Sequence, residues 1–550
     1  MSNYKKFKDP VYGYIQVDAG LVKDIIDTPC FQRLHDVIQT SYAPLYSSAV
    51  HNRFVHSLGV YHLGCIAADT VQNDSENYNF DISRYLEIFK VACLLHDVGH
   101  APFSHTGEDF YLKDGERTEI HKELISLTED TNLEWEIVKK QYKAAPHELM
   151  SVIVSLKEFS FLFENPQEKS FFARCIVGYP YVTDDKEHKD SSSSLHSFLN
   201  CMISLLNSSV IDVDKLDYLI RDAYIIGFDT VSIDYTRLLE NFEIKGNAGN
   251  YDFYYKKGAV SVIENVVFAH DAEKKWIQNH PVVVYESYLL KRIMEELQTR
   301  YNTSQLFSYD SLSEDGINIS DTFRVRLLSD SDIMFLMKNL DSEAASEYFD
   351  RNNRRHSFWK SEAEYKALIG AILGDKSLSI FEKRIKDLHK YLNNINGTNE
   401  INEAALKACN EDIEAIKKDL LSGKGMDSDE QIRLTNHLNE VTARCEWLTA
   451  FKDFADKENI KFDFVILEAN QFNSGFSKNA LGEIKIHFPT LKNACNLGDV
   501  ANILKADKSH RKFFYYIFYR RDDNTRKVPD VKHLLGNLVA MSTREAVINQ

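Results

Sequence analysis

LLHDVGHAPFSH, residues 94–105, places a histidine and an aspartate side by side at the end of an apolar segment. The preceding residues 91–95 have the apolar spacing of a buried helix, and Gly99 and Pro102 are expected to end it. A neighbouring His–Asp pair at such a helix end costs desolvation free energy unless both side chains are paired or bind a cation. Imidazole suits iron, zinc and manganese, and carboxylate suits manganese and magnesium. The stretch therefore predicts a metal site.

Histidines are concentrated in this stretch. His96, His100 and His105 lie within ten residues of a chain that has 19 histidines in all. A single histidine is more often a hydrogen-bonded core or capping residue, but three of them beside Asp97 favour a metal or catalytic site. The helix end expected at Gly99 would leave His100 and His105 on a turn next to that site.

Further candidate ligands lie outside the stretch. His56 belongs to residues 51–59, HNRFVHSLG, and a second candidate, Asp214, lies in a predicted helix at 213–226. That helix carries three polar side chains four residues apart, and therefore on one face: Asp214, Tyr218 and Asp222. Lys215 is close enough around the helix to project into the same cavity. Taken alone, Asp214 is equally compatible with a helix cap or a surface carboxylate.

The composition is that of a folded protein with an acidic balance. Apolar residues make up 44% and charged residues 27% of the 550 residues, which favours about two to four packed subdomains. With 82 acidic and 65 basic residues, the formal net charge is −17. A net-acidic surface repels phosphate backbones, so nucleic acid is not an expected partner. A local basic pocket for a small phosphorylated ligand is still compatible with this balance.

Signals for other compartments are not found in the sequence. No stretch approaches the about 18 consecutive apolar residues of a membrane span, and the lysine-rich residues 1–10 do not look like a secretory signal. The 8 cysteines form no CxxC pair, so neither a zinc ribbon nor a disulfide framework is indicated. We therefore expect a cytoplasmic protein without a membrane partner.

The chain is predicted to be mainly α-helical, because only 10 prolines and 22 glycines interrupt its periodic segments. The predicted helices are 18–39, 59–71, 83–95 and 213–226, with a strand pair at 11–17 and an exposed loop at 184–194. Long charged helices are expected at 380–421 and 430–454, around a turn at 422–429. This hairpin could be an inserted arm or a solvated pair that serves packing only. Residues 461–468, 482–488 and 513–519 are predicted to be strands.

The order His56, His96-Asp97, Asp214 resembles the H…HD…D signature of the HD-domain metal-dependent phosphohydrolases. Five stretches are similar to the dNTP triphosphohydrolases, especially the SAM-and-HD-domain type and its bacterial relatives: DPVYGYIQV, IIDTPCFQRL, HNRFVHSLGV, HDVGHAPFSH and IDVDKLDYLIRDAYIIGF. The similarity is strong over residues 8–230 and weaker to residue 300. It returns in FDFVILEANQFNSGFSKNALGEIKIHF.

This resemblance implies a domain order and a cofactor. The expected domains are an HD-domain helical core at 1–310, a helical extension with the long hairpin at 311–457, and a small α+β lobe at 458–550. One divalent metal (manganese, iron, magnesium or zinc) would be bound by four side chains: His56, His96, Asp97 and Asp214. The metal identity does not follow from these ligands.

The resemblance also implies the roles of the surrounding residues. His100, His105 and His147 would surround the α-phosphate, and Glu108 would orient a catalytic histidine. The implied substrate-binding residues are Arg53, Gln39, Lys215, Tyr218 and Asp222. Water would attack the α-phosphorus, and the 5′-oxygen would leave with a proton from His105 or, as the second candidate, His147. The products would be a nucleoside and inorganic triphosphate.

Some positions depart from the family pattern. Glu108 stands where the family has Asp, Thr40 follows Gln39 where Leu is usual, and Asp271 falls near an expected substrate-binding Arg. Nearby basic residues in 274–280 could substitute, or could form an ordinary amphipathic face. These departures lie among the implied catalytic and substrate contacts and not among the four implied metal ligands.

Relatives of this type form dimers or tetramers with nucleotide-activator pockets. Asp27 and Arg33 resemble residues near such pockets, although a helix-start salt bridge between them is the simpler interpretation. Residues 351–356, RNNRRH, could hold an activator phosphate or form a solvated face. Two other functions stay open: an HD phosphodiesterase or phosphatase for another cyclic or signalling nucleotide, and a nucleotide-sensing regulator with low turnover. A role in limiting nucleotide pools for antiviral defence is a further implication of the resemblance.

Overall fold

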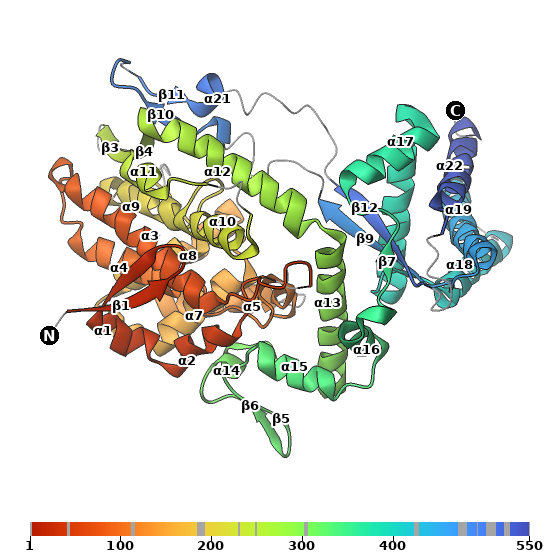
Figure 1. Cartoon of the computed structure of the whole chain (residues 1–550), viewed down its shortest axis with the longest axis horizontal. Coiled ribbons are helices and arrows are strands. Elements are labelled where there is room, and N and C mark those ends of the chain that lie inside the picture. Colours follow the sequence, from red (N-terminus) through yellow and green to blue (C-terminus); the bar gives the residue numbers. More distant parts are fainter. Residues whose placement is uncertain are drawn as a thin grey trace. The chain divides into compact units, whose positions relative to one another are not determined.

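The computed structural model describes residues 3–40, 44–111, 116–183, 193–228, 232–247, 250–301, 306–422, 428–470, 481–491, 493–501, 513–521 and 529–548. This part of the chain is mainly helical, which confirms the predicted fold class (Figure 1). The chain divides into two compact units. The first comprises Met1–Gln278, Ile293–Leu340 and Ser474–Ser509, and the second comprises Asn279–Arg292, Asp341–Asn473 and His510–Gln550. The predicted segments 1–310, 311–457 and 458–550 remain a prediction, because each unit draws on alternating parts of the chain.

The first unit holds the HD motif. Its longer helices are α3 (Arg53–Asn73), α4 (Ser83–Leu95), α5 (Glu116–Thr128), α6 (Thr131–Lys140), α7 (Pro146–Glu158), α8 (Pro166–Val177), α9 (Ser193–Leu206), α10 (Val213–Ile226), α12 (Val260–Glu273) and the C-terminal part of α13 (Pro281–Tyr301). Shorter helices are α1 (Ala19–Leu21), α2 (Pro29–Gln32), α11 (Tyr235–Glu240), α14 (Tyr309–Leu312), α15 (Asp330–Lys338) and α21 (Leu497–Val500). Around the motif, helices α3, α4, α7, α8 and α10 pack together.

Local sequence explains where the two site helices begin and end. The Asn52 side chain caps α3 by accepting from the backbone N–H of Val55 at 3.3 Å. Asp212 caps α10 by accepting from the N–H of Lys215 at 2.8 Å, and Gly227 ends that helix at φ 74°. These caps fix the two helices whose first residues carry the predicted ligands.

Two predictions near the N-terminus are wrong in detail. The strand pair is β1 (Tyr4–Asp9) with β2 (Gly13–Asp18), so its first strand lies before residue 11. Most β1 side chains are exposed and many are lysines, so the strand lacks the alternating apolar pattern by which strands are predicted. The helix predicted over 18–39 is broken into α1, a π-turn, α2 and a 3₁₀ turn that ends at Asp36. Pro29 occupies the first turn of α2, where its missing N–H is tolerated, and it cannot continue the preceding turn.

The strands of the first unit form small sheets. One sheet has the order β11-β10-β4-β3, from β3 (Phe242–Asn247), β4 (Asn250–Lys256), β10 (Lys485–His487) and β11 (Cys495–Asn496). Strand β10 pairs parallel to β4, which are 231 residues apart at Ile486 and Tyr255. A two-stranded sheet joins β5 (Ile317–Ser320) to β6 (Phe323–Val325). The predicted strand at 482–488 therefore exists but belongs to a sheet of the first unit.

The second unit surrounds a four-stranded sheet with long helices. Its sheet has the order β7-β12-β9-β8, from β7 (His356–Ser357), β8 (Glu400–Ile401), β9 (Phe464–Asn470) and β12 (Phe513–Tyr519). Its helices are the N-terminal part of α13, α16 (Glu343–Phe349), α17 (Glu362–Asn396), α18 (Glu403–Ser422), α19 (Ser428–Glu458) and α22 (Val531–Ile548). Ile385, Cys409 and Leu448 join the buried core of this unit. The predicted helical hairpin thus packs into a core through one face.

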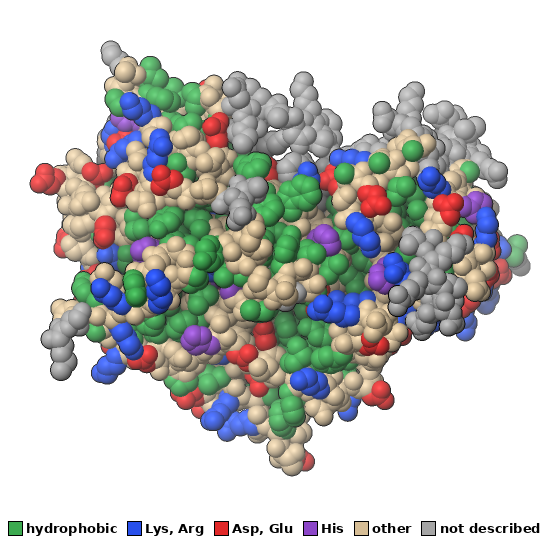
Figure 2. Space-filling view, viewed as in Figure 1, with side chains coloured by type: hydrophobic (Ala, Val, Ile, Leu, Met, Phe, Trp, Pro, Cys, Tyr) green, Lys and Arg blue, Asp and Glu red, His purple; other side chains and the backbone are tan. Residues whose placement is uncertain are grey.

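Two predicted features fall partly outside the described residues: the loop at 184–194 and the turn at 422–429. No helix among the described residues combines the length and apolar composition that a bilayer crossing requires. On the face shown in Figure 2, basic and acidic side chains are interspersed between apolar ones.

Candidate active site

All four predicted metal ligands lie together. His56 comes from the first turns of α3, His96 and Asp97 follow the end of α4, and Asp214 lies in the first turn of α10. The Nε2 atom of His56 lies 3.3 Å from Nε2 of His96 and 3.0 Å from Oδ1 of Asp214. Oδ2 of Asp97 lies 3.5 Å from each of the two Nε2 atoms. Their role as ligands stays a prediction, and their convergence is what that prediction requires.

The second ring nitrogen of each histidine fixes which nitrogen faces the cluster. Nδ1 of His56 lies 2.7 Å from the Asp217 carboxylate, and Nδ1 of His96 lies 3.0 Å from the carbonyl of Cys93. Both acceptors place a proton on Nδ1, so in the neutral form of each ring Nε2 carries the lone pair that a metal would take. The Asp214 and Asp217 carboxylates outweigh burial and raise the pKa of His56 to about 9, so a metal bound here would displace a proton from His56 Nε2.

The spacing of these atoms fits one divalent metal. Atoms bound about 2.1 Å from a single cation at tetrahedral or octahedral angles lie about 3.0–3.4 Å apart. The His56–Asp214 and His56–His96 separations of 3.0 and 3.3 Å fall in this range. The donor set of two imidazoles and two carboxylates can hold manganese, iron, zinc or magnesium.

A buried ion-pair chain supports His56, and only one of its pairs has a signal in the sequence. Arg221 donates from Nε to Oδ2 of Asp217 at 2.9 Å, and from Nη1 to Oδ2 of Asp9 at 2.8 Å. Gly59 makes room for this chain, because a Cβ there would lie 1.9 Å from Oδ1 of Asp217. Asp217 and Arg221 are four residues apart on α10, a spacing that predicts a pair. Asp9 is 212 residues away from Arg221 and carries no such signal.

Replacing Asp217 by Asn should weaken metal binding about 10–100-fold, the usual effect of losing an outer carboxylate partner. The amide no longer balances the Arg221 charge and no longer fixes the proton on Nδ1 of His56. Competition with a fluorescent chelator measures the affinity. Asp222→Asn, a buried carboxylate on the same helix outside the His56 pair, should leave metal affinity close to that of the wild type. Equal affinity in Asp217→Asn and the wild type would contradict the supporting role.

A second cluster adjoins the first and is built around one carboxylate. His105, Glu108 and the first turn of α7 with His147 meet here. Oε1 of Glu108 is in hydrogen-bonding contact with Nδ1 of His105, lies 2.9 Å from Nδ1 of His147, and lies 3.8 Å from Nδ1 of His100. Because the Nδ1 atoms face Glu108, the Nε2 atoms are directed elsewhere.

His100 joins the two clusters. Its Nε2 lies 3.5 Å from Oδ1 of Asp97, and its ring stacks on His147 with centroids 4.2 Å apart. Complete burial and the nearby Arg53 charge hold the pKa of His100 well below its ordinary value, so this imidazole is neutral. Neither of its nitrogens has a hydrogen-bond partner among the described residues. Such orphaned buried atoms mark places where a polar ligand is expected.

The charges of His147 and Glu108 depend on one another. Burial opposes protonation of His147, but the Glu108 carboxylate outweighs it and raises the pKa of His147 to about 9. Burial would raise the pKa of Glu108, yet the adjacent imidazoles hold it well below its usual range. At neutral pH the pair is therefore an imidazolium beside a carboxylate, with His105 exposed at the edge of the cluster.

Replacing Glu108 by Gln should lower the pKa of His147 well below 9, because burial is then opposed only by the smaller effects of Glu148 and Asp97. The imidazolium would persist up to about pH 9 in the wild type, and would be lost at a lower pH in the variant. NMR titration of ¹³C-labelled histidine, assigned with His147→Gln, measures this pKa directly. An unchanged His147 titration in Glu108→Gln would refute the pairing.

Arg53 is committed to protein groups. Its guanidinium donates to Oδ2 of Asp97 at 2.6 Å, to Oγ of Ser104 at 2.8 Å and to the carbonyl of Gln39 at 3.2 Å. This charge and the neighbouring imidazoles outweigh burial and keep the pKa of Asp97 well below its usual range. Gln39 is buried beside it, and its side-chain Oε1 lacks a hydrogen-bond partner among the described residues. Arg53 thus links the predicted sugar-facing residue to the metal cluster.

The predicted α10 residues divide into two groups. Lys215 points to protein acceptors, the Asp212 carboxylate at 2.5 Å and the Ser208 carbonyl at 2.9 Å. Asp222 accepts from Nε2 of His51 at 2.7 Å, and both are buried. His51 was not singled out from the sequence, although it begins the HNRFVHSLG segment. Burial and the nearby Glu273 and Asp214 carboxylates raise the pKa of Tyr218 well above its ordinary value, so this phenol keeps its proton.

Four of the candidate activator residues are bound to other protein groups. Asp27 and Arg33 do not form the simpler salt bridge: Asp27 lies 3.6 Å from Lys5, and Arg33 donates to the carbonyls of Val98 and His100. In the second unit, the run 351–356 is not an open basic face. Arg354 pairs with Glu286 at 2.5 Å, and buried Arg355 pairs with Asp463 at 2.7 Å.

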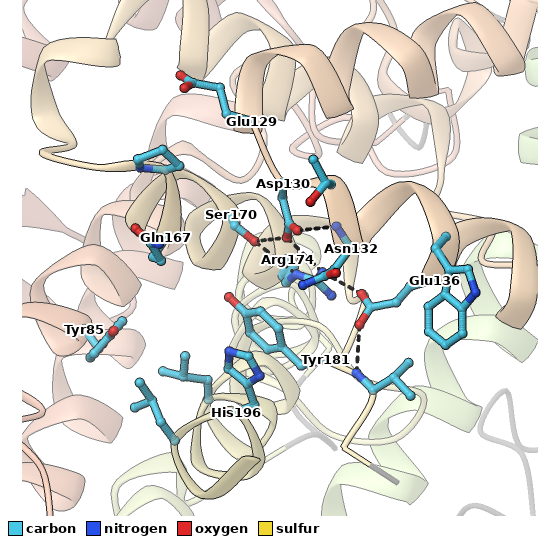
Figure 3. Close-up of a pocket in the computed structure, with 16 residues that line it drawn as sticks. Tyr85, Glu129, Asp130, Asn132, Glu136, Gln167, Ser170, Arg174, Tyr181 and His196 are labelled. Atoms are coloured by element: carbon cyan, nitrogen blue, oxygen red, sulfur yellow. Dashed lines mark hydrogen bonds and ion pairs between the residues drawn. The ribbon is translucent and has the colours of Figure 1, made fainter. Parts of the chain in front are cut away.

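A cavity of about 640 Å³ between α6, α8 and α9 contains none of the predicted site residues (Figure 3). Its centre is the buried Arg174, which pairs with Asp130 at 3.0 Å and with Glu136. The Tyr181 ring lies next to this guanidinium (Figure 3). The His196 ring stacks on Tyr181, with the two ring centroids 4.2 Å apart. These contacts satisfy the buried charge without a ligand.

Residues 53–153 match the family model described as HD domain. This segment of the chain is similar to HD domains. The match includes eight of the candidate site residues and ends before Asp214: Arg53, His56, His96, Asp97, His100, His105, Glu108 and His147. The prediction of an HD-type phosphohydrolase domain is confirmed, as is the prediction that its residues can hold a divalent metal.

Curated relatives extend beyond the HD domain. The chain is 28% identical over 262 residues to the uncharacterized protein MG461 of Mycoplasma genitalium, a match that covers 47% of this chain and 52% of that protein. It is 31% identical over 254 residues to the deoxynucleoside triphosphate triphosphohydrolase SAMHD1 of Gallus gallus, covering 45% of this chain and 38% of that protein. The chain thus spans about half the length of MG461 and less of SAMHD1.

A solved structure shares the fold around the HD domain. A phosphohydrolase from Bacteroides thetaiotaomicron superposes with a TM-score of 0.53 over 94% of this chain and 100% of that chain, at 17% sequence identity. This likeness concerns the arrangement of the chain. The resemblance inferred from the sequence motifs agrees with both kinds of comparison.

Proposed function

We propose that this protein hydrolyses deoxynucleoside triphosphates to a deoxynucleoside and inorganic triphosphate with the help of one divalent metal. The observation that supports this most directly is the juxtaposition of a metal-ligand set with a histidine–carboxylate cluster, joined by the neutral His100. Similarity to the deoxynucleoside triphosphate triphosphohydrolase SAMHD1 supports the substrate class.

The two clusters would divide the work of phosphoryl transfer. A divalent metal held by His56, His96, Asp97 and Asp214 would neutralise phosphate charge and lower the pKa of water. Asp217 and the Cys93 carbonyl keep the Nε2 lone pairs of the two histidines directed at it. Arg53 holds Asp97 in place.

The second cluster would handle the leaving group. Cleavage between the α-phosphorus and the 5′-oxygen leaves an alkoxide, which needs a proton. His105 is the stronger candidate for this acid, because Glu108 binds its Nδ1 while 69% of its side-chain surface stays exposed to solvent. His147, charged at neutral pH, would bind the phosphate as a fixed cation. Glu108 orients both rings.

The sugar would be placed by neutral and paired groups. Gln39 offers a buried side-chain Oε1 that lacks a hydrogen-bond partner among the described residues, and Asp222 is held by His51. Tyr218 retains its phenolic proton. Lys215 would reach a phosphate only by leaving Asp212, so its contribution is expected to be smaller than that of His147.

The alternative function is a phosphohydrolase that acts on another nucleotide; it is called the runner-up below. Near the position where the resemblance leads one to expect an arginine, α12 instead carries His270 and Asp271, and burial lowers the pKa of His270. A neutral imidazole and a carboxylate give weaker attraction to a triphosphate than arginine does. A phosphodiester or a monophosphate of another nucleotide would then be the substrate.

Product analysis tests the proposal. The purified protein, loaded with manganese, is incubated with the four dNTPs singly and as a mixture, and nucleoside and phosphate products are separated by ion exchange. Intact triphosphate in equal amount to nucleoside supports the proposal. Release of pyrophosphate or single phosphate would reject it in favour of the runner-up. Chelation by EDTA should stop the reaction, and added manganese should restore it.

We also propose nucleotide activation within a homo-oligomer. The support is the resemblance of Asp27 and Arg33 to residues near activator pockets, together with the basic run at 351–356, which could supply groups for an activator phosphate. Turnover that appears only in dNTP mixtures, together with a mass increase by light scattering, would support this. Full activity of a monomer on single dNTPs would contradict it.

A further inference from the structure

The turn that carries the second cluster has an unusual backbone. Between His100 and His105, two consecutive residues with side chains have positive φ, Phe103 at 57° and Ser104 at 53°. Residues other than glycine rarely adopt this left-handed region, because Cβ crowds the following carbonyl. Two such residues in succession persist only where surrounding contacts hold them. This segment, residues 100–105, is called the catalytic turn below.

A carboxylate from a distant helix binds the turn at its strained residue. Oδ1 of Asp330, the first residue of α15, accepts from the backbone N–H of Phe103 at 2.7 Å. Its other oxygen, Oδ2, accepts from the backbone N–H of Ile38 at 2.9 Å, next to Gln39. One carboxylate thus joins two segments of the candidate site that are 65 residues apart in the chain.

Further bonds close this connection into a ring. The Ser104 hydroxyl donates to the carbonyl of Ile38, while Arg33 donates to the carbonyls of His100 at 3.0 Å and Leu328 at 2.7 Å. Leu328 precedes Asp330 by two residues, so both sides of the catalytic turn are bound to the start of α15. Nothing else among the described side chains accepts from the N–H of Phe103.

We propose that Asp330 is a positioning residue that holds the catalytic turn and the Gln39 segment in register with each other. It does not reach the metal ligands or the reacting atoms. Its effect on catalysis rests on the proposed function, through the placement of His100 and His105. Its effect on backbone order is independent of that function.

Charge on Asp330 adds a testable pH dependence. Burial raises the pKa of Asp330 to about 7, although the two N–H bonds favour the charged form. The ionisable groups that face it are Asp36 and Arg33, from the 3₁₀ turn Arg33–Asp36. Asp332 lies two residues further along the same helix. Above pH 7 the carboxylate accepts both N–H bonds. As the pH falls through 7, a proton occupies one oxygen and one bond weakens, but the raised pKa means that the closed turn binds this proton more tightly than an opened one, so keeping Asp330 buried costs less free energy.

Hydrogen exchange of Asp330→Asn measures the backbone effect. The amide keeps one oxygen, so one of the two N–H groups loses its acceptor, and exchange in the peptides containing Ile38 and Phe103 should rise about tenfold. The matched control is Asp332→Asn, two residues along the same helix, whose carboxylate accepts only from Ser329 in its capping box. Unchanged exchange at both segments in Asp330→Asn would overturn the proposal whatever the activity. If that variant fails to fold, Asp330→Glu, whose carboxylate is displaced by one methylene, should raise exchange in the same two peptides, and unchanged exchange there would equally overturn the proposal.

Kinetics measure the catalytic effect. In Asp330→Asn, kcat should fall about 10²-fold, the scale of a misplaced catalytic group, with KM and metal content little changed. The ratio of wild-type to variant kcat should shrink as the pH falls from 8 to 6, because the protonated carboxyl, like the amide, is neutral and offers one good acceptor oxygen. Faster exchange with wild-type kcat would overturn the positioning role. A wild type without any nucleotide hydrolysis would contradict the proposed function, and exchange alone would then decide the clamp.

Discussion

Replacing His96 and Asp97 together by alanine should remove the bound metal and abolish hydrolysis. The double change deletes two of the four converging side chains and leaves the Nε2 of His56 facing a single carboxylate, Asp214. Loss of an outer partner alone weakens binding about 10–100-fold, so loss of two direct ligands should exceed that. Metal per chain by plasma mass spectrometry, and nucleoside release by chromatography, measure the two effects.

The chain contains its own control for this experiment. The tetrapeptide LHDV occurs at residues 95–98 and again at 34–37. At residues 34–37, His35 and Asp36 are exposed, and the His35 ring stacks on the Phe54 ring with centroids 3.7 Å apart. His35→Ala with Asp36→Ala should therefore keep the full metal content. Metal and turnover retained after loss of His96 and Asp97 would disprove the site. Two metals per wild-type chain would instead assign a second ion to the cluster around Glu108.

The same comparison shows what the sequence could and could not predict about the site. His96-Asp97 was distinguished from other His–Asp pairs by the apolar helix before it and the histidines after it, and the structure gathers the four expected ligands. Asp217, Arg221 and Asp330 were missed, because each acts through a partner far along the chain. Lys215, which follows the predicted ligand Asp214, was expected to face the cavity, but the capping carboxylate of Asp212 binds it.

Helix bounds were predictable where a cap and a periodic pattern coincide. Helices α4 and α10 match the predicted 83–95 and 213–226, and α10 has both an Asp cap and a terminal glycine. The strands near the C-terminus were recognised by composition, but their partners were not. Strand β9 pairs with β12, whereas β10 pairs with β4. Pairing between distant segments depends on tertiary packing, which local propensity does not encode.

Replacing His105 by alanine should leave the metal in place and slow the chemical step by about 10²–10⁴-fold, the usual contribution of a positioned acid. His105 is 69% exposed and makes its contact with Glu108 rather than with the metal ligands, so its removal spares the first cluster. Single-turnover kinetics separate this step from binding and release. His121→Ala, a half-buried histidine on α5 that bonds Tyr179, is the control and should retain the wild-type rate. Because an acid is most needed when the leaving oxygen is a strong base, a substrate with a p-nitrophenyl leaving group should restore much of the lost rate in His105→Ala. Equal slowing with both leaving groups would assign His105 to phosphate binding and make His147 the acid.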